Sequence, residues 1–317
     1  MSSQSDQKIR IDPSGLLIFN RRTGLNVLLE EIRAPKHLWA RAPRQVSFAL
    51  TNACDLACPY CYAPKVPAAL DLGKVTAWLK ELDSNGCLGV GFGGGEPTMY
   101  RYFAEVCKYA AKETALAVTF TTHAHLVDTT LAKKIEGNVH FIRLSMDGVG
   151  VTYETLRGRS FGTFRTHLEV VRGLAPFGIN FVVNERTLPD LSAALEFASE
   201  VRASEFLLLP QEEVPGLAGV GRPTLTKLHD WIAKYRGPVP LSISEPASET
   251  AHTCAMFAYD RGLRAYAHID ATGMLKRSSF AADGVPIGSG AVIEAFDSLL
   301  VRSGEERSYE NLAELRL

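Results

Sequence analysis

From Gln45 onward, short apolar runs alternate with segments in which apolar residues recur every three or four positions. An apolar run bounded by turn residues is typical of a buried strand, and the three-to-four spacing is typical of an amphipathic helix. The helical spacing is clearest in the segments that begin at Leu72, Phe103 and Leu191. The apolar runs predict six strands, at 45–51, 88–92, 117–121, 139–145, 179–184 and 205–209.

Strands that alternate with helices form parallel sheets, because a right-handed crossover places each helix against a face of the sheet. The pattern therefore predicts an α/β fold, a partial (β/α)6 parallel barrel. In such barrels the chemistry takes place at the carboxyl ends of the strands. Candidate site residues should follow strands in the sequence.

The segments on either side of the barrel have a different pattern. Residues 1–43 contain short apolar runs joined by turns, and we expect an N-terminal β extension there. We assign 44–240 to the barrel and 241–317 to a C-terminal region. That last region carries a predicted β-hairpin made of 263–269, the turn 270–273 and 274–280.

Composition and charge narrow the class of protein. Lys and Arg total 34 against 35 Asp and Glu, so the formal charge of -1 gives no general attraction to nucleic acid or to an anionic membrane. The chain starts with a polar segment, and no run is long and apolar enough for a membrane span. We expect a cytoplasmic protein, in which the six cysteines are reduced and a tight group of them indicates a metal site.

Three cysteines, Cys54, Cys58 and Cys61, lie within eight residues directly after the first predicted strand. Three thiolates can hold three irons of one cubane cluster and leave the fourth iron open to a ligand. A zinc site is the alternative, but its fourth ligand should be near. The closest histidines, His37 and His123, are distant in sequence, which disfavours zinc.

The CxxxCxxC spacing, with Tyr60 between the second and third cysteines, resembles the signature of the radical S-adenosylmethionine (radical SAM) superfamily. The resemblance extends over about 44–280. It implies one [4Fe-4S] cluster, S-adenosylmethionine as cofactor, and an electron donor such as flavodoxin or ferredoxin. In that superfamily the cluster cleaves S-adenosylmethionine reductively, and the 5'-deoxyadenosyl radical takes a hydrogen from the substrate. The resemblance also implies that Tyr60 lies beside the adenine.

The segment Gly93-Gly94-Gly95-Glu96-Pro97, called here the GGGEP turn, follows the second predicted strand. Glycines allow a ligand to approach the backbone closely, and a carboxylate can accept from an ammonium group. In isolation this is only a turn with a carboxylate. Because the equivalent turn of the superfamily binds the methionyl amino group, the resemblance assigns Gly94, Gly95 and Glu96 to cofactor binding.

Polar residues after later strands complete the candidate site. Ser145 can hydrogen-bond ribose or carboxylate, and Arg157 can pair with the methionyl carboxylate, although an ordinary surface salt bridge also explains an arginine. Asn184 ends the fifth predicted strand, where the superfamily commonly presents polar groups to the ribose. His123 and Glu212 are candidates for a catalytic base. The alternatives are that His123 is a structural hydrogen bonder and that Glu212 belongs to a solvated acidic loop.

The C-terminal region resembles the SPASM or twitch region of peptide-modifying radical SAM enzymes, but most of the cysteines that bind auxiliary clusters there are missing. Cys254 stands alone, and one thiol cannot hold a second cluster. Cys87 and Cys107 are expected to be small buried hydrophobes. We expect a metal-free hairpin that closes the open end of the barrel and excludes water; an ordinary accessory hairpin is equally compatible with the sequence.

Three functions are compatible with these features. The first is a radical SAM enzyme that modifies a ribosomally made peptide, which the 145–157 spacing and the twitch-like region favour. The second is a radical SAM enzyme that acts on a small metabolite, nucleotide or sugar, which the missing auxiliary cysteines favour. The third is a non-catalytic iron-sulfur or zinc binder, which the GGGEP turn disfavours. No residue identifies the substrate.

Overall fold

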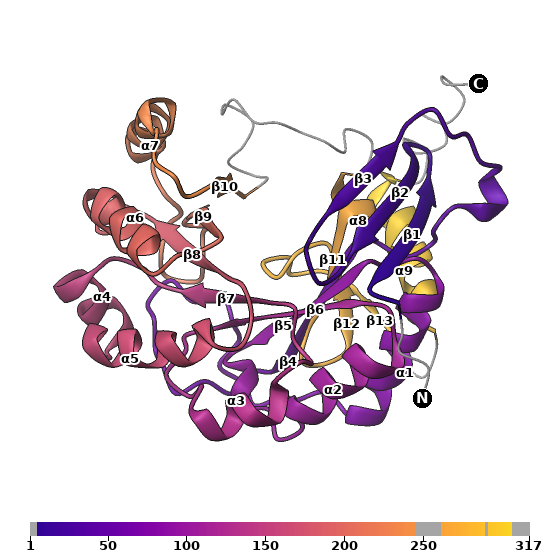
Figure 1. Cartoon of the computed structure of the whole chain (residues 1–317), viewed down its shortest axis with the longest axis horizontal. Helices are drawn as coiled ribbons and strands as arrows, with labels where there is room; N and C mark the ends of the chain where they lie inside the picture. The colour runs from indigo at the N-terminus through magenta and orange to yellow at the C-terminus, as the bar shows by residue number, and fades with distance from the viewer. Residues whose placement is uncertain (1–4, 245–260, 289–290, 306–317) are drawn as a thin grey trace.

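The structure is a computed structural model that describes residues 5–244, 261–288 and 291–305 (Figure 1). All six predicted barrel strands are present in it, and each follows the preceding one in parallel pairing. The prediction of an α/β fold with a parallel sheet is therefore confirmed. The strands are β4 (Gln45–Thr51), β5 (Gly89–Gly94), β6 (Ala117–Thr122), β7 (Phe141–Ser145), β8 (Phe177–Val183) and β9 (Glu205–Pro210).

Helices connect these strands and cover the outer side of the curved sheet, as Figure 1 shows. Several begin at a side-chain cap that satisfies a free backbone N–H, such as Asp71 on Lys74 N and Asp128 on Leu131 N. The helices are α1 (Leu72–Ser84), α2 (Phe103–Glu113), α3 (Thr129–Ile135), α4 (Gly150–Arg157), α5 (Phe161–Arg172), α6 (Leu191–Glu200) and α7 (Arg222–Lys234).

The sheet is wider than the six predicted strands. On one side β10 (Leu241–Ile243) pairs in parallel with β9, although it lies beyond residue 240, where we expected the barrel to end. On the other side β11 (Tyr266–Ile269) pairs in parallel with β4. The strand order β10-β9-β8-β7-β6-β5-β4-β11-β12-β13 gives one 10-stranded sheet, in which β12 is Met274–Lys276 and β13 is Val285–Pro286.

Residues alternate along the barrel strands between two environments. In β4, Val46, Phe48 and Leu50 are fully buried and share one hydrophobic core with residues of the covering helices. The residues between them point to the opposite face, toward the inside of the curve. Ser47 and Ala49 occupy this inner face of β4, and Gly91 and Gly93 occupy it in β5. Small inward residues leave room inside the barrel, whereas large outward residues fill the core.

The N-terminal extension is a three-stranded antiparallel sheet, as predicted, formed by β1 (Gln7–Asp12), β2 (Gly15–Asn20) and β3 (Asn26–Leu29). Buried Arg10 donates to the carbonyls of Ala42 and Gly86, and Arg21 donates to the carbonyl of Thr114. These carbonyls precede β4, β5 and β6. The extension therefore packs at the amino ends of the barrel strands, opposite to their carboxyl ends.

The predicted C-terminal hairpin is confirmed by the antiparallel pairing of β11 with β12. Its first predicted residues instead form the short helix α8 (Gly262–Ala265), and its second strand ends at Lys276. The sequence did not predict α9 (Val292–Ser303), whose first N–H groups are capped by the Glu81 carboxylate of α1. No helix in the described ranges is long and apolar enough to cross a membrane.

Candidate active site

The three motif cysteines lie in the cysteine loop, residues 52–64, which follows the carboxyl end of β4. Cys54, Cys58 and Cys61 are partly exposed free thiols, and the Cys61 N–H donates to the Cys58 carbonyl. Burial raises the pKa of Cys54 and Cys58, and charge on Cys61 raises each further. As thiolates, three cysteines of one loop form a donor set that fits one iron-sulfur cubane.

The other described cysteines do not join this group. Cys87 follows α1 and Cys107 lies within α2, and both side chains are completely buried. Burial raises the pKa of both thiols, as expected for small hydrophobes in the core. Cys254, which we expect to stand without cluster partners, lies outside the described residues.

The GGGEP turn lies directly on the start of the cysteine loop. Gly95 N donates to Thr51 O at 2.7 Å, and Glu96 N donates to Ala53 O at 2.8 Å. A Cβ at Gly94, whose φ is +130°, would lie 2.2 Å from Thr51 O, and one at Gly95 would lie 2.2 Å from Ala53 O. These two glycines are therefore needed for the contact between the two motifs, a reason that the sequence did not indicate.

Glu96 is 1% exposed and both of its carboxylate oxygens accept hydrogen bonds from the protein. Oε1 accepts from the Thr98 and Thr122 hydroxyls at 2.6 and 2.8 Å, and Oε2 accepts from His123 N at 3.0 Å. The carboxylate thereby ties the GGGEP turn to the end of β6. Its predicted contact with the methionyl amino group remains a prediction.

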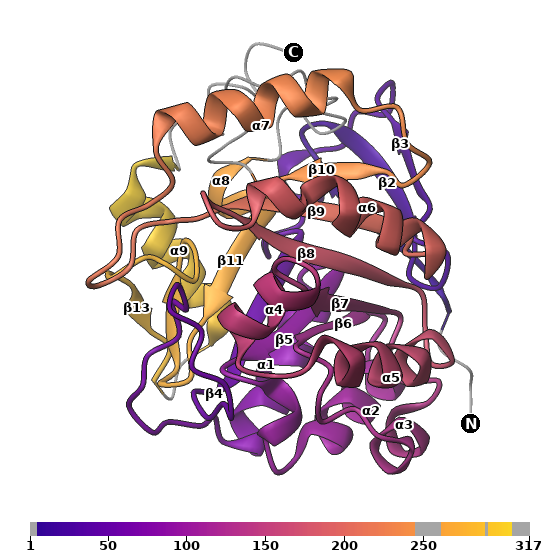
Figure 2. The ribbon, with the colours of Figure 1, turned by 90° about the vertical axis from the view of Figure 1, so that its left-hand side faces the viewer.

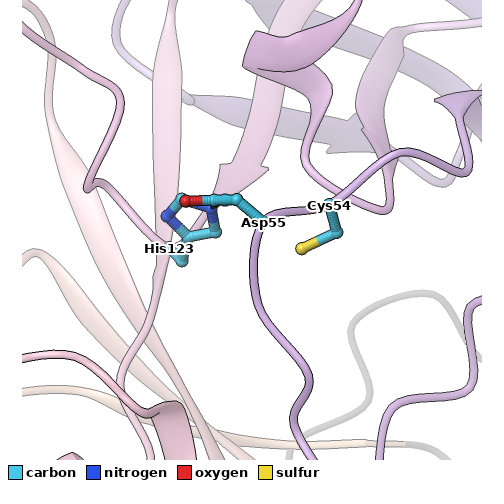
Figure 3. A group of neighbouring side chains, drawn as sticks. All are labelled: Cys54, Asp55 and His123. Atoms are coloured by element: carbon cyan, nitrogen blue, oxygen red, sulfur yellow. Dashed lines mark hydrogen bonds and ion pairs between the residues drawn. The ribbon is translucent and has the colours of Figure 1, made fainter.

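His123 lies beside the cysteine loop, with its ring directed toward Asp55 (Figure 3). Its Nε2 is 2.8 Å from Asp55 Oδ1 and 3.3 Å from Glu96 Oε2. Because Nδ1 accepts from His125 N at 3.1 Å, the proton of the neutral ring is on Nε2 and is donated to the carboxylate. His123 is 4% exposed, and its contacts with Asp55 and Glu96 link the cysteine loop to the GGGEP turn.

His123 is distant from the cysteines in sequence but lies beside Cys54 in space, so the sequence distance that we took to disfavour zinc was misleading. β6 and β4 both flank β5, and this arrangement brings the carboxyl ends of the three strands together. Donor atoms of Cys54, Asp55 and His123 lie within 4.8 Å of one another (Figure 3). Asp55 also pairs with Arg159 at 2.9 Å. Burial opposes ionisation of Asp55, but its interactions with His123 and Arg159 outweigh burial and lower its pKa.

The backbone next to His123 is strained. Ala124 is fully buried and has a φ of +70°, in the left-handed region that residues with a Cβ rarely adopt. His125 follows it, and its Nε2 lies 2.8 Å from the Tyr153 hydroxyl. Burial lowers the pKa of His125 to about 4, so this ring is neutral. Backbone strain of this kind gathers at functional sites, where surrounding contacts hold it.

A second network connects the cysteine loop to β7 and α4 through the fully buried carboxylate of Asp147. Asp147 Oδ2 accepts from the Tyr60 hydroxyl at 2.6 Å and forms an ion pair with Arg157, while Oδ1 accepts from Val182 N at 2.7 Å. Although burial opposes the charge on Arg157, Asp147 outweighs it and raises the pKa of the guanidinium. In the sequence, Asp147 was noted only as a position within the 145–157 spacing. Its place directly after a strand is the feature that could have marked it as a site residue.

Arg157 retains one unsatisfied donor within this network. Its Nη1 lies 3.5 Å from Cys58 Sγ, and its buried Nε has no partner among the described residues. A buried donor without an acceptor is costly unless a ligand supplies one. An anionic group held beside Cys58 would satisfy it, which fits the predicted contact with the methionyl carboxylate.

The remaining predicted residues are less closely connected. Ser145 ends β7 next to Asp147, whereas Asn184 uses its amide to accept from Thr187 N and to donate to Gln211. Asn184 therefore orders its own loop in this structure. Glu212 is partly exposed after β9 and lies outside both networks. Its neighbour Glu213 lines a pocket beside the cysteine loop.

The structure is a parallel partial barrel with three cysteines and a glycine-rich turn at the carboxyl ends of its strands, an arrangement that fits the resemblance to the radical SAM superfamily. In agreement, residues 48–190 match the model of the Radical SAM superfamily. Members of that superfamily use a [4Fe-4S] cluster and S-adenosylmethionine. The chain thus resembles radical SAM enzymes over this segment, and its relatives include peptide-modifying members, as the sequence predicted.

Similar proteins cover 60% to 93% of the chain. The Fe-coproporphyrin III synthase of Methanosarcina barkeri is 27% identical over 60% of this chain and 48% of its own length. The PqqA peptide cyclase of Rhodopseudomonas palustris is 29% identical over 60% of this chain and 54% of its own length. The chain thus spans about half the length of these relatives. The structure of Streptococcus suis SuiB has a TM-score of 0.71 at 14% identity, covering 93% of this chain and 88% of SuiB, which shows a shared fold.

Proposed function

We propose that this protein is a radical SAM enzyme that modifies a ribosomally made peptide. The observation that supports the proposal is the contact of the GGGEP turn with the start of the cysteine loop, the loop that carries all three thiols. Peptide as the substrate class is supported by relatives named as a PqqA peptide cyclase and a mycofactocin maturase. The fold is also shared with a SuiB structure bound to its precursor peptide SuiA.

Each network has a distinct task in this proposal. Cys54, Cys58 and Cys61 would hold a [4Fe-4S] cluster, which with bound S-adenosylmethionine supplies a 5'-deoxyadenosyl radical for hydrogen abstraction. Arg157, whose Nη1 lies beside Cys58 and whose buried Nε has no partner among the described residues, binds the methionyl carboxylate. The Tyr60 ring lies beside the adenine while its hydroxyl remains on Asp147. Gly94, Gly95, Glu96, Ser145 and Asn184 complete the proposed cofactor contacts.

The surrounding residues hold this arrangement in place. Asp55 and His123 join the cysteine loop to the end of β6, and Glu96 joins the same strand end to the GGGEP turn. The C-terminal hairpin lies beside the cysteine loop and would exclude water from a reactive radical. An electron donor such as flavodoxin or ferredoxin would supply the electron, and the reducing cytoplasm would keep the thiols free to bind iron.

Two other functions have a specific observation in their favour. A relative named Fe-coproporphyrin III synthase favours a small-molecule substrate. The grouping of Cys54, Asp55 and His123 favours a zinc site. However, His123 and Asp55 already bond to each other and to Glu96 and Arg159, and a zinc ion there would leave Cys58 and Cys61 unused.

Peptide modification is tested by co-expression with short genes that neighbour the coding sequence. Mass spectrometry of the co-expressed peptide should show a mass change with the parent enzyme and none with the Cys58→Ala variant. If every neighbouring peptide keeps its mass while an added metabolite is converted by the parent, the peptide assignment is wrong and the small-molecule function takes its place.

A further inference from the structure

A pocket of about 260 Å³ lies inside the barrel, between the cysteine loop and the C-terminal hairpin. Figure 2 shows this hairpin beside the cysteine loop. The pocket is lined by Gly94 of the GGGEP turn and by residues of the loop that follows β9. Its lining includes Asn52, Tyr62, Glu213, His268 and Phe280. At this volume it is smaller than the roughly 300–1,000 Å³ of drug-sized sites, so it suits one amino-acid side chain and not a tetrapyrrole.

A buried histidine of β11 offers one nitrogen to this pocket. His268 is 5% exposed, and its Nδ1 lies 2.6 Å from Ser47 Oγ, which in turn lies 2.5 Å from the Tyr266 hydroxyl. Among the described residues its Nε2 has no hydrogen-bond partner. Burial lowers the pKa of His268 to about 4, so the ring is neutral. Since Ser47 can accept from Nδ1–H and donate to Tyr266, Nε2 is free to act as an acceptor.

The charges around the pocket leave an excess of negative charge. Asp270 and Lys276 form an ion pair at 2.9 Å and offset each other. The Glu213 carboxylate has no ion-pair partner in the described part of the chain. The rings of Tyr62 and Phe280 lie 4.7 Å apart between centroids and form an aromatic wall. A neutral acceptor, an unpaired carboxylate and aromatic faces together favour a cation.

We propose that this pocket binds a basic side chain, that of a lysine or arginine, of the peptide substrate. His268 Nε2 accepts a hydrogen bond from its cationic group, Glu213 supplies the opposite charge, and Tyr62 and Phe280 contact its aliphatic stem. The assignment rests on the proposed peptide-modifying function. It names His268 and Glu213 as residues that bind the substrate next to the cofactor turn.

The test measures binding of two probes that differ only in charge to the full chain, reconstituted with iron, sulfide and S-adenosylmethionine. The probes are N-acetyl-lysine N-methylamide and N-acetyl-norleucine N-methylamide, titrated by saturation-transfer nuclear magnetic resonance. We expect the lysine probe to bind roughly tenfold more tightly. Glu213→Gln should bring this ratio close to one, and His268→Leu should weaken the lysine probe at least fivefold.

A matched control separates pocket effects from general loss of a buried histidine. His140 accepts from Val118 N at 2.9 Å, and burial also lowers its pKa to about 4, but it precedes β7 at the opposite end of the barrel. His140→Gln should keep the parent's affinity for the lysine probe. Circular dichroism checks the fold of each variant, and because Glu213 is exposed, its variant decides the test even if His268→Leu does not fold.

Two results overturn the assignment: equal affinity of the parent for both probes, or an unchanged preference for lysine in Glu213→Gln. The same samples are assayed for 5'-deoxyadenosine, which keeps the two proposals distinguishable. Formation of 5'-deoxyadenosine without a lysine preference rejects the pocket assignment alone. A lysine preference without any 5'-deoxyadenosine supports the pocket and rejects the radical function.

Discussion

Replacing the Asp147 carboxylate by an amide tests whether one buried charge pair holds the cysteine loop to the barrel. In Asp147→Asn the charge on Arg157, whose side chain is only 10% exposed, stays in a largely buried position without its counter-ion. The Tyr60 hydroxyl also loses its anionic acceptor. The new amide can still accept from Val182 N, so the end of β8 keeps its hydrogen bond.

The expected loss of stability follows from these contacts. Removal of one partner of a buried ion pair costs about 3–5 kcal/mol, because the remaining charge is desolvated and uncompensated. We therefore expect the free energy of unfolding of Asp147→Asn to fall by about 3–5 kcal/mol, a large part of the roughly 5–15 kcal/mol typical of a folded domain. The loosened loop should also retain less iron after anaerobic desalting.

Urea unfolding followed by circular dichroism measures the loss of stability in parent and variant. Asp128→Asn is the matched control, because this exposed residue caps α3 and asparagine caps helices as well as aspartate. It should lie within about 0.5 kcal/mol of the parent. If Asp147→Asn unfolds at the same urea concentration as this control, Asp147 does not anchor the cysteine loop.

Four further predictions address the cluster, the cofactor turn, the strained backbone and the pH response. The reconstituted protein should hold about four irons and four sulfides; Cys58→Ala should lose them and Cys254→Ala should not, whereas about eight irons would reveal a second cluster. Glu96→Gln should weaken S-adenosylmethionine binding by ten- to about a hundredfold in equilibrium dialysis with unchanged iron, and unchanged binding would place Glu96 outside the site. Ala124→Gly should raise the free energy of unfolding by about 1 kcal/mol, because glycine adopts the positive φ without strain; a loss of stability would contradict this. The pKa of His268 falls from 6.5 to about 4 on folding, so its contribution to stability is complete above pH 6.5 and is lost as the pH falls toward 4. Measured by urea unfolding across this range, the free energy of unfolding should depend less steeply on pH in His268→Gln than in the parent. Identical slopes would refute the lowered pKa of His268.

The barrel could be predicted from the sequence because its strands and helices have strong local patterns. Alternate residues of β4 are large and apolar, and α1 repeats apolar residues at helical spacing. β10 could not be found in this way, because three residues carry too little pattern and its place is set by pairing with β9. The same holds for the helical start of the hairpin, which is only four residues long.

The sequence predicted the motifs of the candidate site but not the contacts that join them. The three cysteines lie within one short segment and the GGGEP turn within another, so the residue types in each segment alone indicated a metal and cofactor site. The contacts of His123 with Asp55 and of Asp147 with Tyr60 join residues more than sixty positions apart. Such pairs depend on which strand ends lie side by side, which no local pattern specifies.

Formation of 5'-deoxyadenosine shows whether the cysteine loop and the GGGEP turn form a radical SAM site, as we propose. The anaerobically reconstituted chain is incubated with S-adenosylmethionine and dithionite, and 5'-deoxyadenosine is quantified by mass spectrometry. We predict 5'-deoxyadenosine in the parent and none in the Cys54→Ala, Cys58→Ala or Cys61→Ala variants. A parent that forms none despite a full complement of iron, or one that binds stoichiometric zinc instead, would contradict the claim.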